Sequence, residues 1–386
     1  MKEKILNFNL LETLPVWTFS LYFIFNFMDR NIANIFLLIT LFICIINYKK
    51  LYYHLKRRSN LLKSIMLFTV YIFLVGFYHQ TPLNELDNYF RFLLLLPLLI
   101  IAVDDKHIVR LLSLCAIFGL VHAYNADAFL SINEYPRYRG TSSSAITYAG
   151  MSSTMFAICL YFIFYKKLMS FEIFFSSIIF LILFLLTQTR GPILGIITVF
   201  IFLAFAIKYH SGKSVSYKAS IAALIILIFT ILFIPNSTGN RILLISEINI
   251  AEPLETENYS LRQRLFYLLY GIEEIKINPY VGIGPQHLES NMRKHVNDNS
   301  LKNIKPQDHL HNEFLDLILK FGPLALIFLL IIYLQLLKTN NDRRILLILV
   351  LIMLLTTQLT QSHFAHHQAI SFFITTLFVF SNNKQA

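Results

Sequence analysis

Residues 170–208 read SFEIFFSSIIFLILFLLTQTRGPILGIITVFIFLAFAIK, and this stretch decides the fold class of the chain. Two apolar blocks, 170–187 and 191–208, are separated by a short polar turn that contains Arg190. A helix of about 20 apolar residues crosses the hydrocarbon layer of a membrane. Transmembrane β-strands would instead show weak alternation over segments of about 10 residues. The stretch therefore predicts two membrane-spanning helices joined by a tight turn.

The remainder of the chain has the same character. Of its 386 residues, 56% are hydrophobic and only 14% are charged, against about 25% charged in a soluble domain. This composition excludes a soluble globular enzyme and a disordered chain. We predict an all-α polytopic membrane protein of about twelve transmembrane helices. The expected spans are 12–28, 32–48, 61–78, 89–103, 108–124, 145–164, 170–187, 191–208, 219–235, 322–338, 345–358 and 368–380.

One long polar insertion, residues 236–321, interrupts the series of apolar blocks. The chain is therefore expected to consist of helices one to nine in 1–235, a large loop in 236–321, and the last three helices with a short tail in 322–386. The three cysteines all lie inside apolar blocks, which argues against a disulfide framework or a metal cluster.

The distribution of basic residues predicts the orientation in the membrane. Of the 33 Lys and Arg residues, 19 fall in segments on the side of the N-terminus, 5 in short segments on the other side, and 9 in the long insertion. Because cytoplasmic segments carry the excess of positive charge, both termini should be cytoplasmic and 236–321 should lie outside. The net charge of +11 is then a topology signal, and no nucleic-acid partner is expected.

The long insertion should contain one amphipathic helix, from about Leu261 to Ile277, begun by a Ser260–Gln263 capping box. Leucines and isoleucines gather on one face, and Arg264 falls at the edge of that face. Arg264 should therefore lean toward the body of the protein. Arg262 falls on the opposite edge, where it is expected to be solvated or paired with Glu273.

Further along, Gly282 and Gly284 are separated by one residue and indicate a tight backbone turn. The pair is not a dinucleotide fingerprint, because the third glycine and the surrounding strand–turn–helix unit are missing. There is also no Walker motif. No nucleotide partner is therefore expected.

The most polar part of the insertion is the run from Asp308 to Asp316. Its histidines, His309 and His311, are two positions apart and cannot form a zinc site of the HExxH type. A helix beginning near Asn312 would place His311 at its N-terminus, where a histidine can act as base or donor. His309 need not face the same groove as His311. Glu313 and Asp316 would share one face of the helix.

Two further outer segments carry polar residues. Arg137 and Arg139, in a loop with two tyrosines, could contact phosphate or sugar. A second histidine group, at positions 363, 366 and 367, is expected to be mostly structural.

Three of these motifs together resemble the O-antigen ligase family, whose members join O-polysaccharide to the lipid A core. Thr187-Gln188-Thr189-Arg190 resembles the family's TQTR-type turn. Residues 260–265 resemble its outer arginine helix, with Arg264 at the family arginine. His311-Asn312, followed nine residues later by Gly322, resembles its H[NSQ]x9Gxx[GTY] signature, from which Ala325 departs at the last position. The resemblance extends over the whole layout of the chain.

The resemblance implies a GT-C-like glycosyltransferase of the inner membrane of a Gram-negative bacterium, with a periplasmic active site and no cofactor or metal ion. It implies a donor polysaccharide on undecaprenyl diphosphate, a lipid A core acceptor, and membrane lipid as surroundings. The implied catalytic residues are His311 as general base, with Arg190 and Arg264 on the diphosphate. The implied substrate-binding residues are Arg262, Arg137, Arg139, Gln188, Asn312 and Glu313.

Three alternatives remain open at this stage. O-antigen polymerases and protein O-oligosaccharyltransferases share much of the same pattern. A flippase for lipid-linked oligosaccharides would also be a basic protein with many spans. Such a transporter should carry charged residues near the midplane of its spans and related halves, whereas here the polar residues concentrate on one side.

Overall fold

The computed structural model describes residues 2–129, 137–142, 144–168, 170–211, 259–299, 301, 304–338 and 343–382. Within these ranges every element of regular secondary structure is a helix. This agrees with the predicted all-α class.

The helices of the first half are α1 (Lys2–Asn26), α2 (Arg30–Ile46), α3 (Tyr48–Arg57), α4 (Ser59–Tyr78), α5 (Leu83–Leu86), α6 (Arg91–Leu94), η1 (Leu96–Ile100), α7 (Asp105–Asn125), α8 (Ala145–Leu160), η2 (Tyr161–Tyr165), α9 (Phe171–Leu186) and α10 (Gly191–Ser211). Those of the second half are α13 (Tyr259–Ile277), η5 (Pro285–His287), α14 (Leu288–Asp298), α15 (Glu313–Phe321), α16 (Pro323–Leu337), α17 (Arg344–Gln358), η6 (His363–Ala365) and α18 (His367–Phe380).

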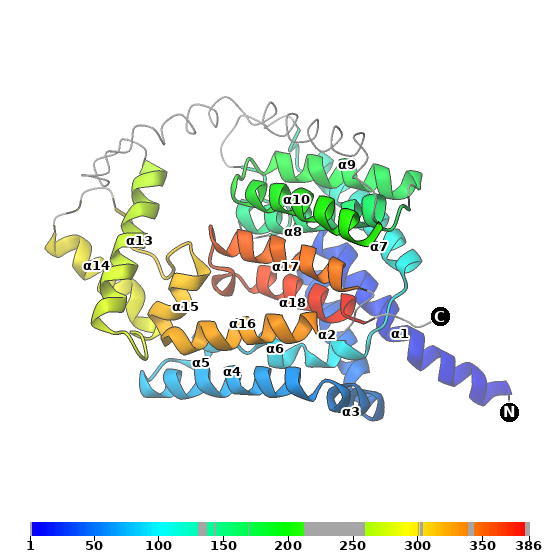
Figure 1. Ribbon diagram of the computed structural model, residues 1–386, viewed down its shortest axis with the longest axis horizontal. Coiled ribbons are helices and arrows are strands. Elements are labelled where there is room, and N and C mark those ends of the chain that lie inside the picture. Colours follow the sequence, from blue (N-terminus) through cyan, green and yellow to red (C-terminus); the bar gives the residue numbers. More distant parts are fainter. Residues whose placement is uncertain are drawn as a thin grey trace.

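Most of the long helices run roughly along the long axis of the molecule, as Figure 1 shows. At one end of this bundle α13 and α14 stand across the helix axes, and α15 lies between α13 and α16 (Figure 1). At the opposite end lie α3, the start of α1 and the end of α18. The end formed by α13, α14 and α15 and the end formed by α3, α1 and α18 therefore consist of different helices.

Four helical stretches among the described residues are long and apolar enough to cross a membrane: Ser59–Tyr78, Asp105–Asn125, Ala145–Tyr165 and Gly191–Tyr209. A fifth results if α2 and α3, which are bent by 86°, are counted as one. Four shorter apolar helices are α9, α16, α17 and α18. The chain is thus a helical membrane protein. The expected span 219–235 lies outside the described residues, and the number of twelve spans stays a prediction.

The predicted span 89–103 was wrong as a single helix. The chain here forms two short helices, α6 and η1, because Pro97 lies in the first turn of η1 and a proline inside an α-helix removes a hydrogen bond and clashes with the preceding turn. The backbone groups left over are satisfied from elsewhere. Asn382 Nδ2 donates to the carbonyl of Ile101 at 3.1 Å, and Arg343 Nη2 donates to that of Val103 at 2.5 Å.

Helix α8 lies in the middle of the bundle, where it contacts α9, α10, α17 and α18. Its central residues are small, and neighbouring helices can therefore approach closely. The hydroxyls of Ser152 and Thr154 donate to carbonyls of the preceding turn, Tyr148 O at 2.8 Å and Gly150 O at 2.7 Å. Polar side chains are thus satisfied inside a bundle core that is otherwise apolar.

The amphipathic helix expected over 261–277 is confirmed as α13, but its buried face was predicted wrongly. The buried residues are Phe266, Tyr267 and Tyr270, whereas Leu268 and Leu269 are 40% and 38% exposed. Aromatic rings bury more area than leucines, and they form a separate core with α14 and the segment before α15. The buried members of this core are Phe266, Tyr267, Tyr270, Ile283, Leu288, Met292, Val296, Ile304, Leu310 and Leu319.

Candidate functional site

The His motif lies where the chain enters α15. Asn312 is the N-cap of this helix, with its Oδ1 accepting from the backbone N–H groups of Phe314 and Leu315 at 3.1 Å each. The expectation of a helix beginning near Asn312 is confirmed. His311, directly before the cap, has a φ of 55°. A non-glycine residue rarely adopts this left-handed conformation, which is concentrated at functional sites.

The end of α15 is held by the glycine turn predicted from the sequence. Ile283 N donates to Leu319 O at 2.8 Å, and Gly284 N donates to Lys320 O at 3.1 Å. Gly282 and Gly322 both have positive φ, and a Cβ on either would collide with the backbone of the other segment. This explains the glycine of the His signature: it lets the turn pack against α15 and fixes that helix. Ala325, the departing position, is fully buried.

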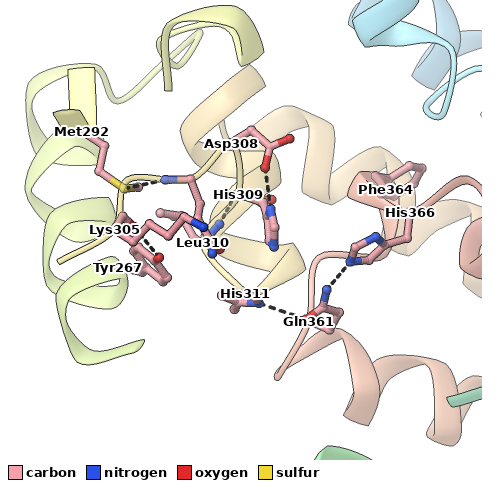
Figure 2. A network of polar contacts seen from close by, with 12 residues as sticks. Tyr267, Met292, Lys305, Asp308, His309, Leu310, His311, Gln361, Phe364 and His366 are labelled. Atoms are coloured by element: carbon pink, nitrogen blue, oxygen red, sulfur yellow. Dashed lines mark hydrogen bonds and ion pairs between the residues drawn. The ribbon is translucent and has the colours of Figure 1, made fainter. Parts of the chain in front are cut away.

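Figure 2 shows the polar network around His311. His311 Nδ1 lies 2.9 Å from Gln361 Oε1, and Gln361 Nε2 contacts His366 Nε2. An amide oxygen only accepts hydrogen bonds, so Nδ1 of His311 carries the proton. The other ring nitrogen of His311, Nε2, is then left with a lone pair that can accept a proton.

A second imidazole lies beside the first. His309 Nδ1 donates to Asp308 Oδ1 at 2.7 Å, and this hydrogen bond lowers the pKa of the Asp308 carboxyl to about 2. The ring centroids of His309 and His311 are 4.4 Å apart. His309 therefore faces the same space as His311, which the spacing of two residues did not indicate. Its Nε2 is buried and has no hydrogen-bond partner among the described residues.

The surroundings keep His311 neutral. Burial lowers its pKa to about 4, with further contributions from the charges of His309 and Arg264. The largest cause is the loss of water around the ring, which disfavours its charged form. His366 shows the same behaviour, since burial lowers its pKa to about 4.

The charges of two arginines of the predicted set influence this region. The charge of Arg264 acts on His311, and the charge of Arg137 acts in turn on Arg264. Arg264 as a whole is exposed to solvent. Partial burial of its guanidinium group nevertheless lowers the pKa of Arg264, and the positive charge of Arg137 lowers it further. The two like charges repel each other, and a bound anion would offset this repulsion.

The TQTR-type turn reaches the same region through the segment that follows α17. Arg190 is half-buried and directly precedes α10. Gly191 lies against Thr360, so closely that a Cβ at position 191 would collide with the threonine hydroxyl. Thr360 is the neighbour of Gln361, which contacts His311. Gln188, in the middle of the turn, has a φ of 52°, a second non-glycine residue in the left-handed region.

The remaining predicted residues are two arginines and two residues whose side chains bond within the protein. Arg262 is half-buried and Arg139 is exposed. Within the described residues Arg262 forms no ion pair with Glu273, and its Nε is buried without a hydrogen-bond partner. Asn312 and Glu313 use their side chains inside the protein, since Asn312 caps α15 and Glu313 is fully buried.

Glu313 and Asp316 share one face of α15, as expected, but that face is internal. Glu313 Oε2 accepts from Phe364 N at 2.9 Å, and burial raises the pKa of this carboxyl to about 8. Asp316 accepts from Leu310 N at 2.9 Å and pairs with Lys320 at 3.4 Å. The two carboxyls thereby tie the histidine segment and the loop before α18 to α15.

Sequence reasoning missed Gln361 and His366, because the loop that holds them was expected to be structural. That expectation describes His363, which is fully buried with its Nε2 2.7 Å from Thr357 Oγ1, but not His366. The available signal was the predicted topology, which places the loop before α18 on the same side as the His motif. The described residues contain no group of three His, Cys, Asp or Glu side chains that could hold a metal ion.

A stretch of the chain matches a known protein family. Residues 175–330 match the family model described as O-antigen ligase. These residues include the TQTR-type turn, the arginine helix and the His signature. No curated protein matches the chain. The match, together with the three motifs inside it, shows that residues 175–330 are similar to the O-antigen ligase family.

Proposed function

We propose that the protein is an O-antigen ligase. It transfers O-polysaccharide from undecaprenyl diphosphate to a sugar hydroxyl of the lipid A core, at the periplasmic face of the inner membrane, without a metal ion. The observation that carries the proposal is the neutral His311, held by Gln361 and next to His309, with the charge of Arg264 acting on it. An anion site beside a neutral imidazole suits a reaction with an anionic leaving group and an alcohol nucleophile.

In this proposal Arg190 and Arg264 bind the donor diphosphate. A guanidinium group binds phosphate oxygens through two parallel hydrogen bonds and stays charged. When the bond between the first sugar carbon and the diphosphate breaks, the leaving group takes the electron pair, and the arginines stabilise that charge. Arg137 adds to the same field because it acts on Arg264.

His311 takes the proton from the acceptor hydroxyl. Its Nδ1–H is held by Gln361, and Nε2 is the basic atom. As the acceptor oxygen bonds to the sugar carbon, its O–H bond breaks and the proton passes to Nε2. Because its pKa lies near 4, the ring is neutral at periplasmic pH and ready to accept the proton.

The other predicted residues have supporting roles. Gln188, Arg262 and Arg139 contact the donor or the acceptor from around the site. Asn312 and Glu313, whose side chains are occupied within the protein, position His311 by fixing the start of α15 and the loop of Gln361.

The topology part of the proposal places α14 in the periplasm and α3 in the cytoplasm. The native cysteines Cys44, Cys115 and Cys159 are buried, so an introduced cysteine reports its own side. In cells with a permeabilised outer membrane, Asn297→Cys should react with an impermeant maleimide, and Lys56→Cys should react only after the inner membrane is opened. The reverse pattern would refute this orientation.

Deletion of the gene tests the reaction itself. A ligase deletion should leave lipid A core without O-chains while long lipid-linked polymer accumulates. Continued attachment of single repeats would indicate a polymerase instead. Loss of glycan from periplasmic proteins, with intact lipopolysaccharide, would indicate a protein O-oligosaccharyltransferase.

A further inference from the structure

Helix α3 is placed unlike any helix of the bundle. It follows α2 after one residue and is bent from it by 86°. Figure 1 shows it at the end of α4 that lies away from α13 and α14. Since α2 is apolar and runs along the bundle, a helix at nearly a right angle to it lies across the end of the bundle, in the direction of the membrane plane. None of the residues of α3 is buried.

The two faces of α3 differ in what they contact. Leu51 and Leu55 are half-buried and pack against the bundle core. On the outer side Tyr48, Tyr52 and Tyr53 are exposed, by 65%, 68% and 64%. Exposed tyrosine rings of this kind are enriched where a protein meets the membrane–water interface, since one end of the ring is apolar and the other polar.

The same outer side carries four exposed cations: Lys49, Lys50, Lys56 and Arg57. The sequence contains no Asp or Glu between Asp29 and Glu85, and within the described residues no ion pair involves these four side chains. Their positive charges are felt at His54, which is half-buried: partial burial lowers its pKa, and Arg58, Lys50 and Arg57 lower it further. Among the described residues, no acidic side chain therefore neutralises the positive charge of α3.

Arg58, the residue after α3, is turned inward and fixes the helix to the bundle. Its guanidinium donates to the Ser381 hydroxyl at 2.6 Å and to the Ser381 carbonyl at 3.1 Å. The basic and aromatic surface is thus presented by a helix that is anchored at its end, so the surface is available in a fixed orientation.

We propose that α3 is a binding surface for anionic phospholipid headgroups. The helix lies in the headgroup layer on the face of the membrane opposite the His311 site, with its tyrosine rings at the acyl boundary and its cations on lipid phosphates. A polybasic segment next to a spanning helix attracts anionic lipid with about 1 kcal/mol per cation. The proposal does not depend on which sugar transfer the site carries out.

The test uses the full chain in a neutral detergent micelle, titrated with phosphatidylglycerol or with phosphatidylcholine. A ligand that binds only the folded state raises the Tm in a saturable way. Phosphatidylglycerol should raise the Tm and phosphatidylcholine should not. In a variant with Lys49→Gln, Lys50→Gln, Lys56→Gln and Arg57→Gln, the apparent affinity should fall on the order of 10²–10³-fold.

A matched control removes exposed cations at the other end of the molecule, with Lys276→Gln, Arg293→Gln and Lys294→Gln. This variant should keep the phosphatidylglycerol effect. If the fourfold variant does not fold, the pairs at 49/50 and at 56/57 should each show an intermediate loss. The proposal is overturned if the α3 variant responds like wild type, if phosphatidylcholine is equally effective, or if soluble polyglutamate gives the same shift, which would indicate an acidic protein partner.

Discussion

The His311 end and the α3 end of the molecule both hold clustered basic residues, but in different surroundings. Near His311 the charge of Arg264 acts on a neutral imidazole, and partial burial together with the charge of Arg137 lowers the pKa of Arg264. At α3 the cations are exposed on one helix, and they form no ion pair with the residues that the structure describes. The attraction between a cation and an anion is stronger where protein replaces water around them. Where water remains, the attraction is weaker and is screened by salt. The first arrangement suits one defined anion, the second a surface of many.

The largest expected effect distinguishes the arginines of the His311 site from the exposed arginine of α3. Arg190→Ala or Arg264→Ala should lower transfer on the order of 10³-fold or more, as loss of a transition-state arginine does, and Lys should restore it only partly because it lacks the fork. Arg57→Ala at the α3 end is the matched control and should stay within about twofold. A purified assay with defined donor and acceptor measures this. Near-normal transfer by both site variants, at normal protein levels, would remove the diphosphate assignment.

The next effect distinguishes the two neighbouring histidines. His311→Ala should slow the chemical step by about 10²–10⁴-fold, the range of general-base catalysis, while the donor still binds. His309→Ala should have a smaller effect, because its Nε2 is buried and its Nδ1 is held by Asp308. Single-turnover rates with bound donor test this pair. An inactive His309→Ala with an active His311→Ala would show that the other histidine is the base.

The pH dependence follows from the lowered pKa of His311. Because the ring loses its proton above about pH 4, the acidic limb of kcat/KM should lie near pH 4 and not near 6.5. The charge of His309 contributes to this lowering, so His309→Asn should move the limb upward and reduce activity at pH 5 more than at pH 8. His54→Asn, at the α3 end, should leave the profile where it is. An acidic limb near 6.5 in the wild type would contradict the desolvated base.

A stability effect is expected from the carboxyl beneath the site. Burial raises the pKa of Glu313 to about 8, so the folded protein holds a proton that the unfolded chain releases at about pH 4.5. The stability that this proton supplies is complete below pH 4.5 and is lost as the pH rises through 8. Glu313→Gln keeps an acceptor for Phe364 N–H and should flatten the fall in Tm between these pH values. If the Tm of Glu313→Gln depends on pH as the wild-type Tm does, ionisation of Glu313 does not destabilise the fold.

The smallest effect is expected on the rate of sugar transfer when the exposed cations of α3 are replaced. Replacing its four cations by Gln should leave kcat/KM in neutral detergent within about twofold, since exposed surface substitutions seldom disturb a distant site. A large loss in detergent, where no anionic lipid is present, would mean that the two ends are coupled.

Several features could be predicted from the sequence because they depend on local chemistry. Apolar blocks of span length identify helices in a membrane, since no other structure satisfies the backbone there apart from a closed barrel. Asn312 caps α15, which requires only neighbours in the chain, and the spacing of Gly282 and Gly284 by itself marks a turn. The family motifs are local for the same reason, as the match over residues 175–330 shows.

Only the tertiary structure decided which residues meet. Gln361 lies 50 positions from His311 and accepts its Nδ1–H, a contact that no local pattern encodes. His311 has a φ of 55°, and its ring lies against that of His309. From the spacing of two residues, His309 was not expected to face the same groove. The buried face of α13 is aromatic because α14 and the segment before α15 pack there. Likewise Pro97 marks a break in the sequence, but only the carbonyl contacts of Asn382 and Arg343 show how that break is tolerated inside the bundle.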